Sequence, residues 1–116
     1  MDYIYKICVT RVVDGDTIDA EIDLGFDIKI FKRIRLHGID APETRTRDKA
    51  EKAAGFKAKA YLEGVVKDNN NILYLHSMDK GKYGRCIGIL FAPDFQDESI
   101  NDALVNEGHA KLYHKK

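Results

Sequence analysis

Hydrophobic and polar side chains alternate along three successive stretches at the start of the chain, residues 3–13, 17–24 and 28–36. A period of two is typical of half-buried β-strands. The clearest stretch is the second, where one face carries Ile18, Ala20, Ile22 and Leu24 and the other carries Asp19, Glu21 and Asp23. Turn-forming residues separate the stretches, Asp14-Gly15 first and then Gly25 with Asp27. The pattern therefore predicts three strands joined by hairpins.

A helical pattern replaces the alternation after Pro42. Asp48 is positioned as an N-cap, and the helix that follows is expected to end near Lys67. Its predicted apolar face consists of Ala50, Ala54, Ala58, Leu62 and Val65. This spacing is typical of an amphipathic helix that covers a sheet.

Two further strands are expected at residues 72–75 and 85–91, separated by a loop rich in Gly and Lys. Ser99, with Asp102 three residues later, predicts a short second helix that closes at Gly108. Five strands with a helix between the third and fourth is the order of the OB-fold, a small Greek-key barrel. We therefore expect a mainly β protein with helices (α+β) in which residues 1–116 form one domain.

Composition agrees with a globular domain and excludes two other classes. With 116 residues, 44% hydrophobic and 33% charged, the chain is neither disordered nor membrane-like. No apolar run could span a bilayer and the first residues do not resemble a signal peptide, so we expect a cytoplasmic protein, with secretion left open if a leader was removed. Cys8 and Cys86 do not have the spacing of a zinc site.

The formal net charge of zero conceals a basic middle region. Residues 29–67 carry eleven basic and five acidic side chains, whereas residues 1–28 carry two and seven. This distribution suits a site that combines a cation with a polyanion, although strand and helix surfaces often differ in charge for no functional reason.

Candidate chemistry gathers where the third predicted strand ends. Arg35 lies on the polar face of that strand, and Gly38 and Pro42 should stop regular pairing near Asp40. Asp40 and Glu43 would then lie at the strand end. On its own this stretch fits a charged loop after an edge strand as well as it fits a site.

Asp16 favours the interpretation of this stretch as a functional site over that of a charged loop. It shares the parity of Ile18 and should point into the barrel, where a carboxylate is costly unless it is paired or binds a cation. If Asp16 and Asp40 converge, their oxygens suit a hard cation such as calcium. Arg35 and Arg85 would supply planar donors for a phosphate, and Glu43 would be free to act on water.

Three separated motifs resemble the thermonuclease (staphylococcal-nuclease-like) family in order and spacing. They are Val-Val-Asp14-Gly-Asp16-Thr17, Ile34-Arg35-Leu-His-Gly-Ile-Asp40-Ala-Pro-Glu43-Thr and Lys82-Tyr-Gly-Arg85. The resemblance extends from about Thr10 to Lys111 and includes the segment Asn-Asp-Ala-Leu-Val-Asn-Glu-Gly. Three motifs in the correct order make it specific.

The resemblance implies a calcium-dependent nuclease that hydrolyses phosphodiester bonds of single-stranded or unpaired DNA and RNA with little sequence specificity, leaving 3′-phosphate ends. It implies metal binding by Asp16, Asp40 and the backbone carbonyl of Ala41, a position where the family commonly has threonine. By the same likeness, the catalytic residues are Arg35, Glu43 and Arg85, and Lys82 and Tyr83 contact the nucleotide phosphate. Asp14 resembles a residue that supports the metal ligands.

Two other functions remain compatible with the sequence. The same fold occurs as non-catalytic modules that bind nucleic acid or protein, and these usually lose the carboxylates and arginines that are retained here. The second possibility is a protein with an accessory role whose weak nuclease activity is secondary. We expect no membrane partner, and the oligomeric state is either monomer or dimer.

Overall fold

Seven strands and two helices make up the computed structural model, which describes residues 3–78, 86–94 and 98–113. The barrel strands are β1 (Tyr3–Asp14), β2 (Thr17–Asp23), β3 (Lys29–Leu36), β5 (Ile72–Ser77) and β6 (Cys86–Phe91). The helices are α1 (Lys49–Asp68) and α2 (Ile100–Asn106), and two short strands are β4 (Ile39–Asp40) and β7 (Lys111–Leu112).

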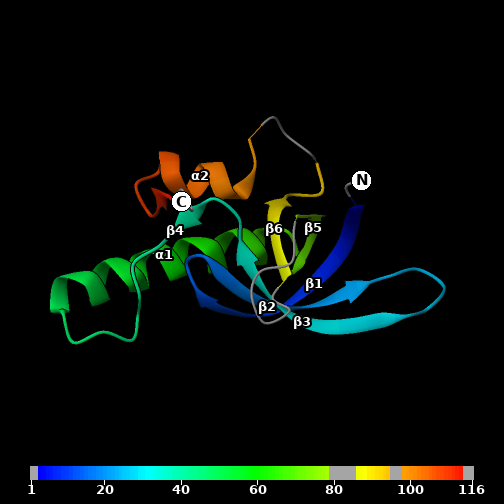
Figure 1. Cartoon of the computed structure of the whole chain (residues 1–116), viewed down its shortest axis with the longest axis horizontal. Helices are drawn as coiled ribbons and strands as arrows, with labels where there is room; N and C mark the ends of the chain where they lie inside the picture. Colours follow the sequence, from blue (N-terminus) through cyan, green and yellow to red (C-terminus); the bar gives the residue numbers. More distant parts are fainter. Residues whose placement is uncertain (1–2, 79–85, 95–97, 114–116) are drawn as a thin grey trace.

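The five long strands close into a barrel in the order β1-β2-β3-β6-β5 (Figure 1). Neighbouring strands run antiparallel except β3 and β6, which are parallel and close the barrel with Ile34 opposite Cys86. The helix α1 connects the first three strands and β4 to β5. The predicted OB-fold barrel, with its helix between the third and fourth long strands, is confirmed.

Alternation along the strands produces the core. Residues of one parity, such as Ile7, Ile18, Ile34, Leu73 and Leu90, are at most 1% exposed. Each fully buried aliphatic side chain stabilises the fold by about 1.5–3 kcal/mol relative to an exposed one. These positions fix the register of every strand, because a slip of one residue would turn the apolar set outward.

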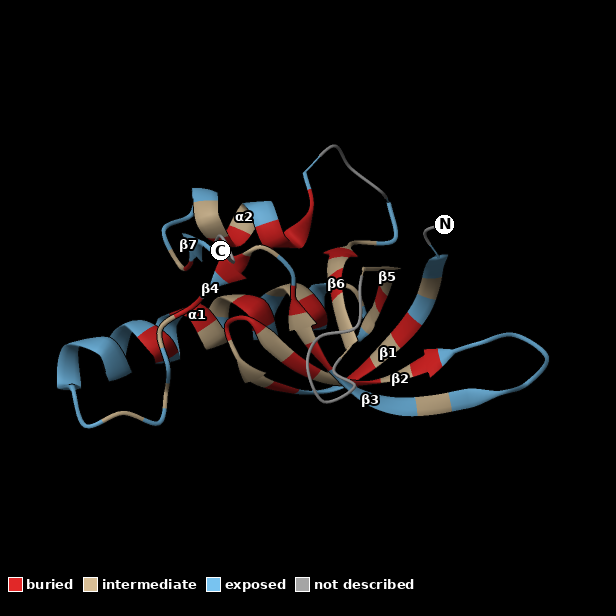
Figure 2. Cartoon of the chain, viewed as in Figure 1, coloured by how far each residue is buried: buried red, intermediate tan, exposed pale blue. Residues whose placement is uncertain are grey.

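The β2–β3 hairpin extends beyond the barrel (Figures 1 and 2). In its turn the Leu24 N–H donates to the Ile28 carbonyl and the Ile28 N–H donates to the Gly25 carbonyl, and Gly25, Phe26 and Asp27 all have positive φ. The predicted apolar face was therefore wrong at the hairpin end: Leu24 is 39% and Ile28 54% exposed, because the strands there have no barrel to cover them.

The helix α1 begins where predicted, with the Asp48 carboxylate accepting hydrogen bonds from the backbone of Ala50 and Glu51. Its buried face consists of Gly55, Ala58, Leu62 and Val66. The prediction that Ala50 and Ala54 face the core was wrong, because the first turns of α1 project past the barrel and are exposed (Figure 2).

The helix α2 is capped by the Ser99 hydroxyl, which accepts a hydrogen bond from the Asp102 N–H as predicted. Gly108, at φ 78°, ends this segment and lets the chain turn back. The next residues form β7, which pairs with β4. Neither described helix is long and apolar enough to cross a membrane.

Candidate functional site

Asp16 lies in the two-residue turn between β1 and β2 and is only 7% exposed. Its Oδ2 accepts a hydrogen bond from the Ala41 N–H at 2.8 Å, and its Oδ1 accepts one from the Thr17 hydroxyl at 2.9 Å. Gly15 makes this position possible, because a Cβ there would lie 2.6 Å from the Ala58 Cβ. The turn is therefore pressed against α1, and the predicted inward direction of Asp16 is confirmed.

Arg35 links the two predicted metal-binding carboxylates. It lies opposite Thr17 on β3, and its Nη1 is 2.9 Å from Asp16 Oδ2 while its Nη2 is 3.4 Å from Asp40 Oδ1. Only 25% of the Arg35 side chain is exposed, so the pair with Asp16 is weakly screened by solvent. The Asp40 side chain is 62% exposed and is held more loosely.

The loop that carries Asp40 is fixed by the C-terminal segment. Asp40 on β4 pairs with Lys111 on β7, and the Tyr113 N–H donates to the Gly38 carbonyl at 2.8 Å. Gly38 has φ 77°, a conformation that favours glycine. The segment after α2, for which no role was predicted, therefore positions one of the acidic residues.

Glu43 is exposed, and the residues beside it are anchored. The Thr44 hydroxyl donates to Asp14 Oδ1 at 2.8 Å, which ties this loop to the end of β1. On the other side, Gly55 of α1 packs so closely that a Cβ there would lie 2.5 Å from the Glu43 carbonyl oxygen. Glu43 thus sits on a loop held between β1 and α1.

Asn101 joins the site to the barrel from α2. Its side-chain oxygen accepts from the Leu90 N–H at 3.0 Å, and its Nδ2 donates to the carbonyls of His37 and Gly88 at 2.9 and 3.2 Å. Asn101 is 3% exposed, so these bonds are sheltered from water. They attach the chain just after Arg35 to β6.

The structure brings together Asp16, Arg35, Asp40 and the backbone of Ala41, and places Glu43 on the adjoining loop. The predicted residues Lys82, Tyr83 and Arg85 lie outside the described residues. The supporting roles of Thr17, Thr44, Gly55 and Asn101 were not predicted from the sequence. A polar Asn101 between Ile100 and Leu104 on the apolar side of a short helix was the clearest available signal.

The acidic pair fits a hard cation in the type of its donors. The cation would be held by carboxylate oxygens of Asp16 and Asp40, with backbone carbonyls and water completing the six to eight ligands that calcium takes. Among the described residues no three His, Cys, Asp or Glu side chains gather in a metal-binding group, so the site would depend on two carboxylates. In the structure, the positive partner of both is Arg35.

A second ion pair lies further along the same hairpin. Arg33 donates to Asp19 from Nε at 2.8 Å and from Nη2 at 3.2 Å. The hydrogen bond from Arg33 lowers the pKa of Asp19, an effect that outweighs the opposing desolvation. The carboxylate of Asp19 is therefore stabilised in its ionised form by its ion pair with Arg33.

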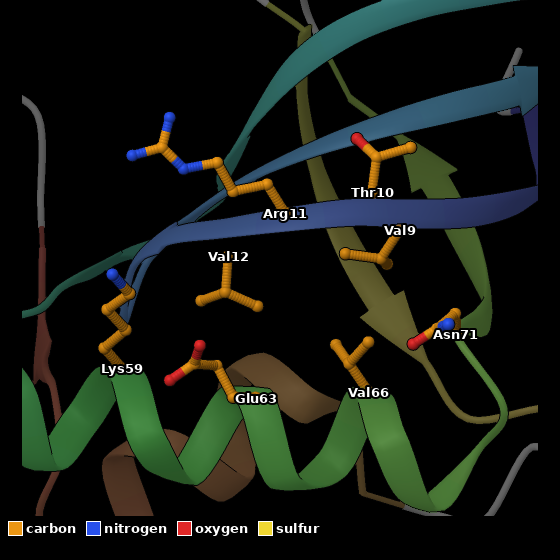
Figure 3. A pocket seen from close by; sticks show the side chains of 8 residues that line it. All are labelled: Val9, Thr10, Arg11, Val12, Lys59, Glu63, Val66 and Asn71. Atoms are coloured by element: carbon orange, nitrogen blue, oxygen red, sulfur yellow. The ribbon is translucent and has the colours of Figure 1, made fainter.

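A groove of about 400 Å³ between β1 and α1 is a separate feature (Figure 3). It is lined by Val9, Thr10, Arg11, Val12, Lys59, Glu63, Val66 and Asn71. Lys59, Glu63 and Val66 project from α1 toward β1 in this view. The groove mixes acidic and basic groups and includes none of the predicted site residues, so the chemistry expected from the sequence lies at the Asp16 end of the barrel.

A small closed barrel with an arginine and two carboxylates at one end defines the chain as an OB-fold protein with a polar site. Residues 33–116 match the family described as "Staphylococcal nuclease homologue", and the chain belongs to that family.

Three relatives illustrate the likeness. Protein ParB of Escherichia coli is 33% identical over 111 residues, covering 90% of this chain and 55% of that protein. Thermonuclease of Staphylococcus intermedius is 34% identical over 107 residues, covering 90% of this chain and 59% of that protein. Endonuclease YhcR of Bacillus subtilis strain 168 is 33% identical over 115 residues, covering 94% of this chain and 9% of that protein. The chain thus spans a little over half the length of the first two and a small part of the third.

Proposed function

We propose that this chain is a calcium-dependent nuclease that hydrolyses phosphodiester bonds of DNA and RNA with little sequence specificity. The observation that carries the proposal is the partly buried arrangement in which Arg35 contacts both Asp16 and Asp40, in a member of a nuclease family. Two carboxylates and a guanidinium at one point suit a site that binds a cation and a phosphate together.

The proposed reaction is attack of water on phosphorus with cleavage of the bond to the 5′ oxygen, leaving a 3′-phosphate and a 5′-hydroxyl. Glu43 takes the proton from the attacking water, and the leaving oxygen gains a proton from solvent. A general base in this role contributes roughly 10²–10⁴-fold to the rate. The anchored loop around Glu43 supports this role, because misplacement of a reacting group by about 1 Å costs on the order of 10²-fold.

Arg35 binds the phosphate and stabilises the charge that develops on its oxygens. A guanidinium has five N–H donors, so Arg35 can keep Asp16 through one of them and present others to the substrate. Arg85 is proposed to share this role, and Lys82 and Tyr83 to contact the substrate phosphate. Asp16, Asp40 and the Ala41 carbonyl would hold calcium, which when bound supplies Lewis-acid stabilisation of the phosphate charge. Recognition through phosphate contacts carries no base information, in keeping with low sequence specificity.

Digestion of single-stranded DNA and of RNA with calcium, with a chelator, and with Glu43→Gln tests the proposal. We expect cleavage only with calcium, and a loss of roughly 10²–10⁴-fold in Glu43→Gln with oligonucleotide binding retained. Arg35→Lys provides a matched test, since it keeps the charge and removes the planar fork. Binding without cleavage under every divalent metal would contradict the enzyme proposal.

A non-catalytic nucleic-acid-binding module is the second candidate function. It is favoured by one observation: Arg35 pairs with both carboxylates, and Asp16 also accepts hydrogen bonds from Ala41 and Thr17, so the cluster can also serve the stability of the barrel alone. Under this alternative, Asp16→Asn and Glu43→Gln would leave oligonucleotide affinity unchanged and the wild type would show no turnover.

A further inference from the structure

Phe31 is an exposed aromatic side chain on the outer face of β3. Phe31 is 69% exposed, and its ring makes no ring contact with another described residue. A single exposed apolar side chain is ordinary in a folded protein. The position of Phe31 relative to the candidate site is what gives it significance.

Phe31 shares the outward parity of β3 with Lys29, Arg33 and Arg35, whereas Ile34 and Leu36 of the other parity are buried. Arg33 is two positions after Phe31 in the sequence, and Arg35 is two positions after Arg33. With a strand rise of about 3.3 Å per residue, the Phe31 backbone lies about 13 Å from that of Arg35 on the same face. Phe31 is therefore in line with the proposed phosphate position.

The acidic groups beside Phe31 are neutralised by basic partners. Glu21, directly opposite Phe31 on β2, is 3.5 Å from Lys29, and Asp19 is bound by Arg33 at 2.8 Å. The ring thus lies between two compensated ion pairs. A polyanion passing over this face would meet little net repulsion before it reaches Arg35.

We propose that Phe31 is a stacking platform for a base of single-stranded nucleic acid whose phosphate is held at Arg35. This inference rests on the proposed nuclease function and names the part of the substrate that the hairpin binds. Single strands offer free base faces to exposed aromatic rings, whereas bases in a duplex are already stacked on each other. An OB-fold occupies about 4–16 nucleotides, so a contact about 13 Å from Arg35 falls within its reach.

The first test measures binding of labelled deoxythymidine oligonucleotides of increasing length by fluorescence anisotropy, in chelator so that cleavage cannot occur. We expect Phe31→Ala to weaken binding of the longer oligonucleotides by roughly 5- to 150-fold, the range for loss of one stacked base. Binding of a dinucleotide and of a duplex of the same sequence should change little. Phe31→Trp should restore affinity, and Phe31→Leu, which is apolar without a stacking ring, should not.

Phe26→Ala is the matched control, because Phe26 is also an exposed phenylalanine on this hairpin, at its turn and 97% exposed. We expect it to bind oligonucleotides nearly as well as the wild type. Equal losses in the two variants would overturn the proposal and indicate general apolar adhesion. If Phe31→Ala altered self-association in sedimentation and left oligonucleotide binding intact, the surface would be a subunit contact and the proposal would be wrong.

Failure of this inference and failure of the nuclease proposal give different results. The stacking platform alone would be refuted if cleavage depended on Glu43 but was unaffected by Phe31→Ala. This comparison uses long single-stranded substrates at concentrations below saturation. Length-dependent binding that needs the Phe31 ring, with no cleavage under any metal, would support the platform and refute the catalytic proposal.

Discussion

Asp16 and Asp40 have the same chemical group and very different surroundings. Asp16 is buried and accepts hydrogen bonds from a backbone N–H and a hydroxyl besides its contact with Arg35. Asp40 is mostly exposed and has one long contact with Arg35 at 3.4 Å. Both residues should therefore matter for function, whereas only Asp16 should contribute strongly to the stability of the fold.

We predict that Asp16→Ala and Asp40→Ala both lower calcium-dependent cleavage by at least ~10²-fold, because each removes a proposed metal ligand. Asp16→Ala should also destabilise the fold by about 1–3 kcal/mol, since the Ala41 N–H and Arg35 lose a buried acceptor. Asp40→Ala should stay within about 0.5 kcal/mol of the wild type. Urea unfolding monitored by circular dichroism measures both values, and equal destabilisation by the two variants would contradict the structural contrast.

Tyr61 gives the fold a dependence on alkaline pH. Burial raises the pKa of its phenol, with smaller contributions from Glu107 and Glu98, and its ring lies 4.7 Å from that of His109. A raised pKa in the folded state adds stability below the ordinary tyrosine value of about 10, and this stability is lost as the pH rises through the folded value.

We therefore predict that the wild type loses more stability than Tyr61→Phe as the pH rises from about 9 to about 11. Thermal unfolding of the two proteins across this range gives the difference, and their difference at pH 7 serves as the internal control. Parallel curves would show that Tyr61 does not titrate differently in the folded and unfolded states.

At the scale of elements, the packing of α1 against the loop of Glu43 depends on one glycine. A Cβ at Gly55 would lie 2.5 Å from the Glu43 carbonyl oxygen and 2.9 Å from that of Pro42, and both atoms are backbone. At Gly64, on the same helix, a Cβ would meet nothing within 4 Å. The two positions make a matched pair for testing the contact.

We predict that Gly55→Ala destabilises the protein by roughly 1–3 kcal/mol and lowers kcat, because the helix and the loop must move apart. Gly64→Ala should stabilise it by about 0.5–1 kcal/mol and leave kcat unchanged, since alanine favours the helix. Denaturant unfolding and initial rates on single-stranded DNA measure the two effects. Stabilisation by Gly55→Ala with full activity would show that the loop tolerates the displacement.

The long barrel strands and both helix caps were predictable because they depend on local rules. Alternation placed β1, β2 and β3, and Asp48 and Ser99 marked the helix starts. The exposed ends of α1 and of the β2–β3 hairpin were not predictable in this way, since periodicity does not reveal where the barrel stops covering an element. Strands of two residues, such as β4 and β7, are too short to show an alternation of apolar and polar side chains. They form because segments distant in the sequence meet.

For the site, parity correctly directed Asp16 inward, and the ends of neighbouring strands brought Asp40 near it. The supporting contacts join residues far apart in the chain, such as Thr44 with Asp14 and Asn101 with His37. Such contacts follow from the closed barrel and from the packing of α2, so a linear pattern cannot specify them.

At the scale of the whole molecule, the projecting hairpin end exposes a group of apolar side chains, and the chain carries no formal net charge. The hairpin end exposes Leu24, Phe26 and Ile28, and the formal net charge at pH 7 is zero with a pI near 6.9. Without net charge, no long-range repulsion keeps two molecules apart, so short-range apolar contacts should govern their association.

We predict that the osmotic second virial coefficient, measured by light scattering, is lowest near pH 7 and rises on either side as net charge develops. Phe26→Asn should raise it at pH 7 without destabilising the fold, because Phe26 is 97% exposed and its φ of 54° is one that asparagine tolerates. Phe26→Leu, which keeps an apolar side chain, should behave like the wild type. If Phe26→Asn and the wild type gave the same coefficient, attraction between molecules would have to arise elsewhere on the surface, because the hairpin turn would have lost its most exposed apolar group without effect.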